Sequence, residues 1–286
     1  MAVYDRAYRG YAGELTPAWS RFLIIPRYVY RDVFRSKIFS IFFAGCFLAP
    51  LVFAIIIYLH HNVTALAMMR MPESALFPIA AEFFERFAAI QSFLAFLLAL
   101  FVGPALVAPD LASNGLALYL CRPFSRAEYV LGKMSVLVVL LSLITWIPGM
   151  LLFLFQSSLE GAGWMTDNVR IAAAIMTGFT VWTLVLCLMT LAASAWVKRK
   201  FLAGALVMGT FFVSKAMAAA INAVLLTAWG DVLNLGGLIA TLWAHLFGID
   251  SPTEIPLAVT LFVLAAFCGF CLWLLARKVR AYEVVR

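Results

Sequence analysis

Long apolar runs alternate with short polar connections along almost the whole chain. Six of these runs have at least the ~20 residues that a helix needs to cross a hydrocarbon layer of ~30 Å. They cover residues 38–59, 87–108, 134–155, 171–197, 201–226 and 255–276. A helix satisfies its own backbone hydrogen bonds in lipid. The pattern therefore predicts an all-α, polytopic membrane protein with six transmembrane helices.

An amphipathic pattern precedes the first apolar run. Arg27, Arg31 and Arg35 recur every four residues, and apolar side chains such as Val29 and Val33 fall on the other side. This pattern predicts an elbow helix over 20–36 that lies in the membrane interface, with its arginines toward anionic lipid. A helix packed on protein is the alternative. The arm before it covers 1–19, and a single transmembrane domain covers 20–286.

The connection between the second and third runs carries a local helix signal. Pro123 suits the first turn of a helix, because its missing N–H needs no partner there. Ser125 and Glu128 have the spacing of a capping box, and Gly132 follows just before the next apolar run. We therefore expect a short separate helix over 123–132.

The longest connection, 227–254, lies between the fifth and sixth runs. Leu235, Leu238, Leu242 and Leu246 recur in it at helical spacing. The stretch is too short and too interrupted to span a membrane. It predicts an interfacial or re-entrant helix pair before the last span.

Basic residues fall mostly on one side of the six spans. Seventeen of the twenty-one lysines and arginines lie before the first span, in the second-to-third and fourth-to-fifth connections, and in the tail. Three lie in the other connections, and Lys215 lies inside a span. Because cytoplasmic connections are enriched in lysine and arginine, both termini are expected in the cytoplasm. With 65% hydrophobic residues, the chain fits a bacterial inner membrane. Its net charge of +7 reflects the basic residues on the cytoplasmic side of the spans and gives little support to a nucleic-acid partner.

No catalytic motif is evident in the chain. The string Gly132-Lys133-Met134-Ser135 lacks the upstream glycine and the adjacent serine or threonine of a Walker A phosphate loop. Acidic residues cluster at span ends, so the spans offer almost none of the buried acid–base or nucleophilic groups of an intramembrane enzyme. We therefore expect no catalytic site, cofactor or metal in this chain, and an energy source outside it.

Two polar residues interrupt the fifth span. Lys215 stands near its middle, and a charge at that depth costs ~2.5–3.5 kcal/mol, so it usually faces protein or water. Asn222 follows seven residues later on nearly the same helix face. A role in a transport path or dimer seam is one interpretation. A structural ion pair or a snorkelling side chain is the other.

Two pairs of soft ligands could hold a metal. Cys268 and Cys271 share one face of the last span, and His60 and His61 precede a methionine-rich stretch. Ordinary packing is the favoured explanation at both places, because free cysteine and methionine fill apolar cores and histidine is common at interfaces. The sequence leaves metal binding open at both places.

A family resemblance centres on the polar connection. The string Arg122-Pro-Phe-Ser-Arg-Ala-Glu-Tyr-Val-Leu-Gly-Lys133, preceded by Ala108-Pro-Asp, resembles the second-span exit and coupling helix of permease subunits of type-two ABC exporters. The opening Tyr-Asp-Arg-x-Tyr-Arg-x-Tyr and residues 20–28 are similar to members with an N-terminal elbow helix. The resemblance implies a dimer of this chain bound to two cytoplasmic ATPase subunits, which hold ATP and Mg. The residues it implies for ATPase contact are Arg122, Pro123, Phe124, Ser125, Arg126, Glu128 and Tyr129.

Other functions stay open at this point. A membrane anchor or scaffold of an envelope assembly needs no further motif. A secondary transporter is less favoured, because it predicts buried carboxylates at mid-membrane and the spans have none there. Membrane lipids are expected partners in every case. The substrate, the choice between export, lipid movement and force transmission, and further subunits such as a periplasmic component are not determined by the sequence.

Overall fold

The computed structural model describes residues 24–62, 78–112, 126–197 and 199–278. Every regular element in these ranges is a helix, which confirms the prediction of an all-α protein. Six helical segments within the ranges are long and apolar enough to cross a membrane, as predicted. Their bounds are Lys37–His60, Ala81–Asp110, Ala127–Glu160, Val169–Trp196, Lys200–Leu225 and Leu257–Lys278.

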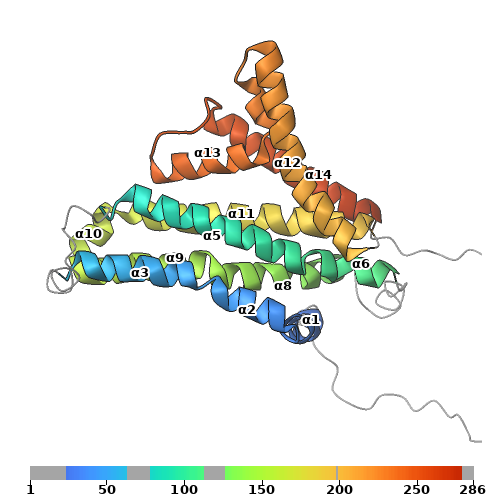
Figure 1. Cartoon of the computed structure of the whole chain (residues 1–286), viewed down its shortest axis with the longest axis horizontal. Helices are drawn as coiled ribbons and strands as arrows, with labels where there is room; N and C mark the ends of the chain where they lie inside the picture. Colours follow the sequence, from blue (N-terminus) through green and yellow to red (C-terminus); the bar gives the residue numbers. More distant parts are fainter. Residues whose placement is uncertain (1–23, 63–77, 113–125, 198, 279–286) are drawn as a thin grey trace, which may run out of the picture.

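Each of the first three spans consists of two helices joined end to end. The pairs are α2 (Lys37–Gly45) and α3 (Leu48–His60), α5 (Ala81–Val102) and α6 (Pro104–Ala112), and α8 (Arg126–Ile144) and α9 (Trp146–Glu160). They lie beside the fourth span, α11 (Val169–Trp196), in an elongated bundle, and the short α10 (Ala162–Asp167) joins α9 to α11 (Figure 1). Pro104 and Pro148 stand next to two of the breaks. Proline lacks the N–H that would continue the helical hydrogen bonds, so it favours a break at these places.

The fourth span is the centre of the bundle. Helix α11 contacts α5, α6, α8, α9, α12, α13 and α14. One contact depends on Gly178, where any side chain would collide with the indole of Trp243 on α13 (Leu235–Phe247). Phe179 packs on the same indole, with ring centroids 4.9 Å apart. Small residues let membrane helices approach closely, and here one of them seats α13 against the bundle.

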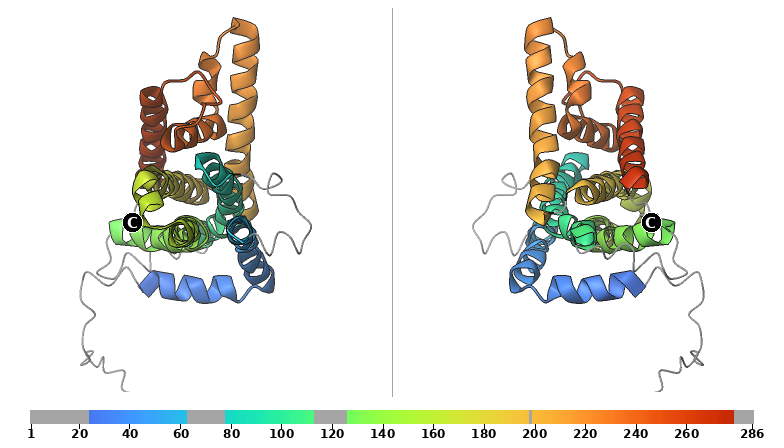
Figure 2. Two further views of the ribbon diagram at one scale, coloured as in Figure 1. Left: turned by 90° about the vertical axis from the view of Figure 1, so that its left-hand side faces the viewer. Right: turned by 90° about the vertical axis from the view of Figure 1, so that its right-hand side faces the viewer.

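The fifth span diverges from the bundle. Helix α12 (Lys200–Leu225) begins near α6, and its far end stands clear, beside the 3₁₀ helix η3 (Trp229–Leu233) (Figures 1 and 2). The sixth span, α14 (Leu257–Lys278), packs against α11 and α13. Large apolar side chains of α12 are exposed, including Phe212 at 68% and Val224 at 79%. Exposed apolar surface on this scale is stable only against lipid or another apolar surface, so α12 is available for contacts outside the chain.

The connections agree with the sequence at one place and differ at another. The predicted helix pair before the last span is present as η3 and α13, and its outer, interfacial or re-entrant position stays a prediction. The predicted separate helix over 123–132 was wrong in its described part, because residues 126–132 are the first turns of α8, which continues through Gly132 to Ile144. A glycine inside a helix costs about 1 kcal/mol relative to alanine, whereas each unsatisfied backbone group in lipid costs several kcal/mol. Residues 123–125 lie outside the described residues.

Candidate functional site

Most of the described basic side chains gather at one end of the bundle. This end carries Lys133, Arg199, Lys200, Arg277 and Lys278, and we call it the basic end. Tryptophans mark the same level, since Lys278 Nζ lies 5.2 Å from the ring of Trp196 and Arg277 lies 5.3 Å from the ring of Trp273. Tryptophan paired with a cation is typical of the membrane–water boundary.

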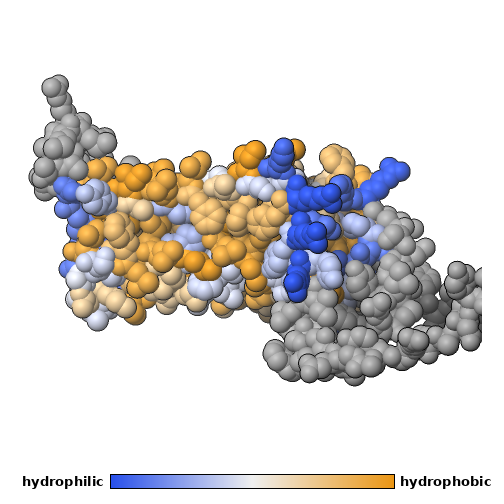
Figure 3. Space-filling model, turned by 90° about the horizontal axis from the view of Figure 1, so that it is seen from below, coloured by the Kyte–Doolittle hydropathy of each residue, from blue (hydrophilic) through white to orange (hydrophobic). Residues whose placement is uncertain are grey.

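Helix α1 (Ile24–Phe34) crosses the bundle at this end (Figure 2). Arg27, Arg31 and Arg35 are exposed, and hydrophilic side chains gather there on a face that is otherwise mostly hydrophobic (Figure 3). The hydroxyl of Tyr30 donates to the carbonyl of Ser135 on α8 at 3.4 Å. Partial burial raises the pKa of Tyr30 above its ordinary value. The described part of the elbow helix is therefore a helix with an exposed basic stripe, and its place in a membrane interface stays a prediction.

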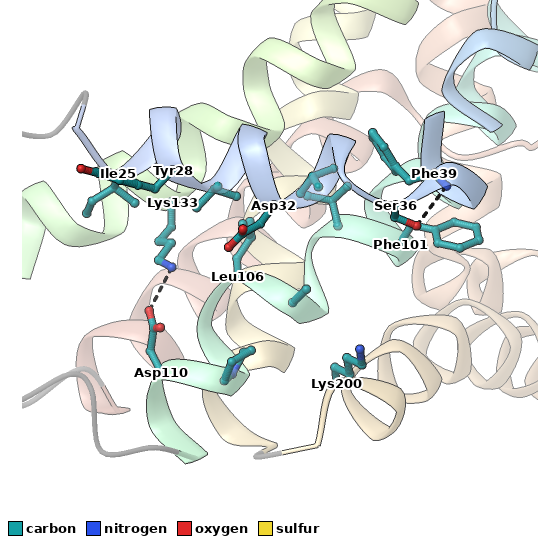
Figure 4. Close-up of a pocket in the computed structure, with 15 residues that line it drawn as sticks. Ile25, Tyr28, Asp32, Ser36, Phe39, Phe101, Leu106, Asp110, Lys133 and Lys200 are labelled. Carbon is teal, nitrogen blue, oxygen red and sulfur yellow. Dashed lines mark hydrogen bonds and ion pairs between the residues drawn. The ribbon is translucent and has the colours of Figure 1, made fainter. Parts of the chain in front are cut away.

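A buried ion pair joins the second span to the third at the basic end. Lys133 Nζ on α8 lies 2.9 Å from Asp110 Oδ2 on α6, and the two side chains are only 6% and 19% exposed (Figure 4). The hydroxyl of Tyr129 donates to the same carboxylate oxygen at 2.8 Å, and Tyr129 is fully buried. Lys133 Nζ also lies 5.7 Å from the centroid of the Tyr129 ring. We call Asp110, Tyr129 and Lys133 the stem joint.

The stem joint lies where the second span ends and the third span begins. Helix α6 ends at Ala112 and α8 begins at Arg126, so the joint ties together the two helices that enter and leave residues 113–125. A carboxylate that accepts two hydrogen bonds from one neighbouring helix holds that helix in a fixed register. A force applied to the connection would therefore reach both helices as one body.

The other end of α6 is fixed to the central helix. The hydroxyl of Ser194 on α11 accepts from the backbone N–H groups of Val107 and Ala108, at 3.1 and 2.8 Å, and donates to the carbonyl of Pro104 at 3.0 Å. These are backbone groups of the first five residues of α6, and a neighbouring hydroxyl can satisfy such groups inside a membrane. At Gly103 a side chain would collide with Thr190 of α11. The stem joint is thus connected to the core of the bundle through α6.

The residues predicted for ATPase contact fall into three groups. Arg122, Pro123, Phe124 and Ser125 lie outside the described residues. Arg126 begins α8, and Glu128 is half-buried. Tyr129 is fully buried in the stem joint, where its hydroxyl donates to Asp110. Their contact with an ATPase stays a prediction.

The stem joint itself was not predicted as a unit. Asp110 and Lys133 both belong to the strings that carry the family resemblance, but their pairing is a contact between separate spans. One signal was available: they are an acid and a base at the adjoining ends of consecutive antiparallel spans, where an unpaired charge would be costly.

The two polar residues of the fifth span have different surroundings. Asn222 Nδ2 donates to Asp231 Oδ1 at 3.1 Å, and its carbonyl oxygen accepts from the N–H of Gly230 at 2.7 Å. Asn222 therefore fastens η3 to the end of α12. Lys215 is exposed, and no ion pair to it is present among the described residues. The structure does not bring the two side chains together, and their part in a transport path or dimer seam stays a prediction.

The candidate metal ligands make other contacts. His61 Nδ1 lies 3.0 Å from the carbonyl of Ile57, and its Nε2 lies 3.3 Å from Glu160, which links α3 to α9 at the end opposite the basic end. Cys271 is buried and Cys268 half-buried on α14. Within the described ranges, no three histidine, cysteine or acidic side chains come together as a metal site.

Comparison of the chain with protein-family models gives no match, and comparison with curated proteins gives none either.

Proposed function

We propose that this chain is the membrane subunit of an ATP-driven transporter of the exporter type, which works as a dimer with a separate cytoplasmic ATPase. The observation that carries the proposal is the stem joint. It locks the helices on both sides of residues 113–125 into one body through a buried ion pair of 2.9 Å and a tyrosine hydrogen bond of 2.8 Å. A connection built only to reverse the chain needs no such lock.

The energy for movement comes from a partner in this proposal. The 286 residues contain no phosphate loop, so ATP and Mg are held by the ATPase subunit. The partner docks on the connection between α6 and α8 and pushes it when the ATPase closes. Rigid-body displacement of packed helices is a common way to transmit such a change.

The path of the movement follows the contacts of α6. Ser194 passes a displacement of α6 to α11, and α12 packs against both α6 and α11. The exposed apolar surface of α12 then faces a second copy of the chain, and a substrate moves out of the cytoplasm or between leaflets at that boundary. Both termini and the connection lie in the cytoplasm, and the membrane is the inner membrane of a bacterium.

The test is a docking experiment on the connection. Phe124→Asp combined with Arg126→Glu is expected to abolish association with the ATPase. The first substitution places a charge in the apolar groove of the ATPase, and the second reverses the charge of residue 126. Met165→Asp is the matched control, since Met165 is an exposed apolar residue of α10 at the opposite end. Association is measured by pull-down from native membranes, and folding by size-exclusion elution of each variant. Normal association of the double variant, in a chain that elutes as the parent does, would reject the docking site.

A further inference from the structure

A pocket of about 760 Å³ opens at the basic end between α1, the start of α2, the α5–α6 junction, α8 and the first residue of α12 (Figure 4). This volume lies in the range of ~300–1,000 Å³ that is usual for pockets that hold small molecules. Six helices contribute residues to its lining, so it is a feature of the folded bundle.

One side of the pocket is apolar. Phe39, Val102 and Leu106 line it and are themselves almost completely buried, whereas Phe101 lines it and is 53% exposed. The apolar wall continues onto an exposed phenylalanine of the second span, a segment long and apolar enough to cross a membrane. A ligand with hydrocarbon chains can therefore keep its chains in the membrane while its polar part enters the pocket.

The other side of the pocket carries charges of both signs. Lys133 is already neutralised by Asp110 at 2.9 Å. Asp32 on α1 and Lys200 on α12 stand on opposite sides of the pocket, and neither has an ion pair among the described residues (Figure 4). The pocket thus offers one carboxylate and one ammonium group, both exposed and without an ion pair in the described part of the chain, that line a shared space.

We propose that this pocket binds the head group of a zwitterionic phospholipid with a primary ammonium group. The lipid ammonium donates to Asp32, the phosphate accepts from Lys200, and the acyl chains leave over Phe101. A primary ammonium supplies N–H donors for charge-assisted hydrogen bonds, which a quaternary choline lacks and an anionic glycerol head group cannot replace. The site stands independently of the proposed transport function, since it requires only that this end of the bundle lies at a membrane surface.

Lipid retention by the purified chain tests the proposal. The full chain is delipidated in detergent and mixed with equal amounts of phosphatidylethanolamine, phosphatidylcholine and phosphatidylglycerol. It is then separated by size exclusion, and its lipids are counted by mass spectrometry. Phosphatidylethanolamine should be retained about threefold over either competitor, since a charge-assisted hydrogen bond to an exposed carboxylate contributes only modestly to affinity. Asp32→Asn should abolish this preference, and Lys200→Gln should lower retention of all three lipids about threefold, because Lys200 is also exposed.

A matched variant and a soluble competitor sharpen the test. Lys37→Gln removes an exposed charge of the same end that does not line the pocket, and it should retain lipid as the parent does. Glycerophosphoethanolamine, which has the head group without chains, should fail to displace the lipid at equal concentration. Displacement by it would show a site for a soluble phosphate compound and overturn the proposal.

Two further results would also overturn it. Equal retention of the three lipids by the parent chain, or an unchanged preference in Asp32→Asn, would show that the unpaired charges do not select the head group. Lipid binding that appears only after removal of residues 1–19 would show that the chain's own N-terminal arm is the occupant.

Discussion

Replacing Lys133 with methionine should lower the free energy of unfolding by about 3 kcal/mol, because it leaves the Asp110 carboxylate buried with only part of its partners. The two side chains are 6% and 19% exposed, which places the pair in the class where loss of one partner costs about 3–5 kcal/mol. Asp110 keeps the hydrogen bond from Tyr129 and some contact with solvent, so the lower end of that range applies. Methionine nearly fills the space of lysine, which keeps any cavity contribution small.

A double-mutant cycle separates the interaction from the cost of each substitution. Asp110→Asn keeps an acceptor for Tyr129 but removes the charge. When it is combined with Lys133→Met, no charge is left unpaired. We expect the double variant to be more stable than the sum of the single effects predicts, with a coupling energy of about 2 kcal/mol.

The assay is reversible unfolding in mixed micelles with increasing dodecyl sulfate, followed by tryptophan fluorescence. Trp196 and Trp273 lie at the basic end and report on it. Lys37→Met removes an exposed lysine of the same end and should leave the midpoint unchanged. A coupling energy below about 0.5 kcal/mol, the usual limit for independent sites, would refute the stem joint as an interacting unit.

Three further predictions concern the packing of α13 on the bundle and the orientation of the chain in the membrane. Arg170 donates to the carbonyls of Leu246 and His245 at 3.0 and 2.8 Å, so Arg170→Gln should lower the free energy of unfolding by about 1 kcal/mol and increase hydrogen exchange at the end of α13. Unchanged hydrogen exchange at the end of α13 would contradict this role of Arg170. Gly178→Val should lower the melting temperature by several degrees, because the new side chain collides with Trp243. Gly163→Val, in open space on α10, should leave the melting temperature unchanged, and equal effects of the two substitutions would argue against the close packing of α13 on α11. In a cysteine-free background, single cysteines at Asn62 and Gly161 should react with an impermeant maleimide added outside the cell, whereas cysteines at Arg126 and Arg199 should not. Labelling at Arg126 would overturn the predicted orientation, in which both termini are cytoplasmic.

The spans were predictable because their signal is local. An apolar run of more than 20 residues needs no knowledge of the rest of the fold to be assigned as a membrane helix. The same holds for α13, whose leucines recur at helical spacing, and for the basic stripe of α1. Each of these patterns lies within one continuous stretch of the chain.

The stem joint and the course of α12 depend on contacts between distant segments. The pairing of Asp110 with Lys133 requires the register of two neighbouring spans, and no periodicity within either span encodes that register. The role of Asn222 likewise appears only once η3 folds back on α12. Gly132 was misinterpreted for a related reason: a local preference for ending a helix is outweighed by the backbone hydrogen bonds that lipid requires.

We propose that this chain transmits force from a separate ATPase, and weighing the native complex shows whether that ATPase is bound to it. The chain is extracted from its own membranes in mild detergent, and the intact assembly is weighed by native mass spectrometry while its ATP turnover is measured. We predict an assembly of two copies of this chain with two copies of one soluble ATPase, and a loss of that ATPase in the Phe124→Asp, Arg126→Glu variant. An active assembly that contains this chain and no ATP-hydrolysing subunit would contradict the claim.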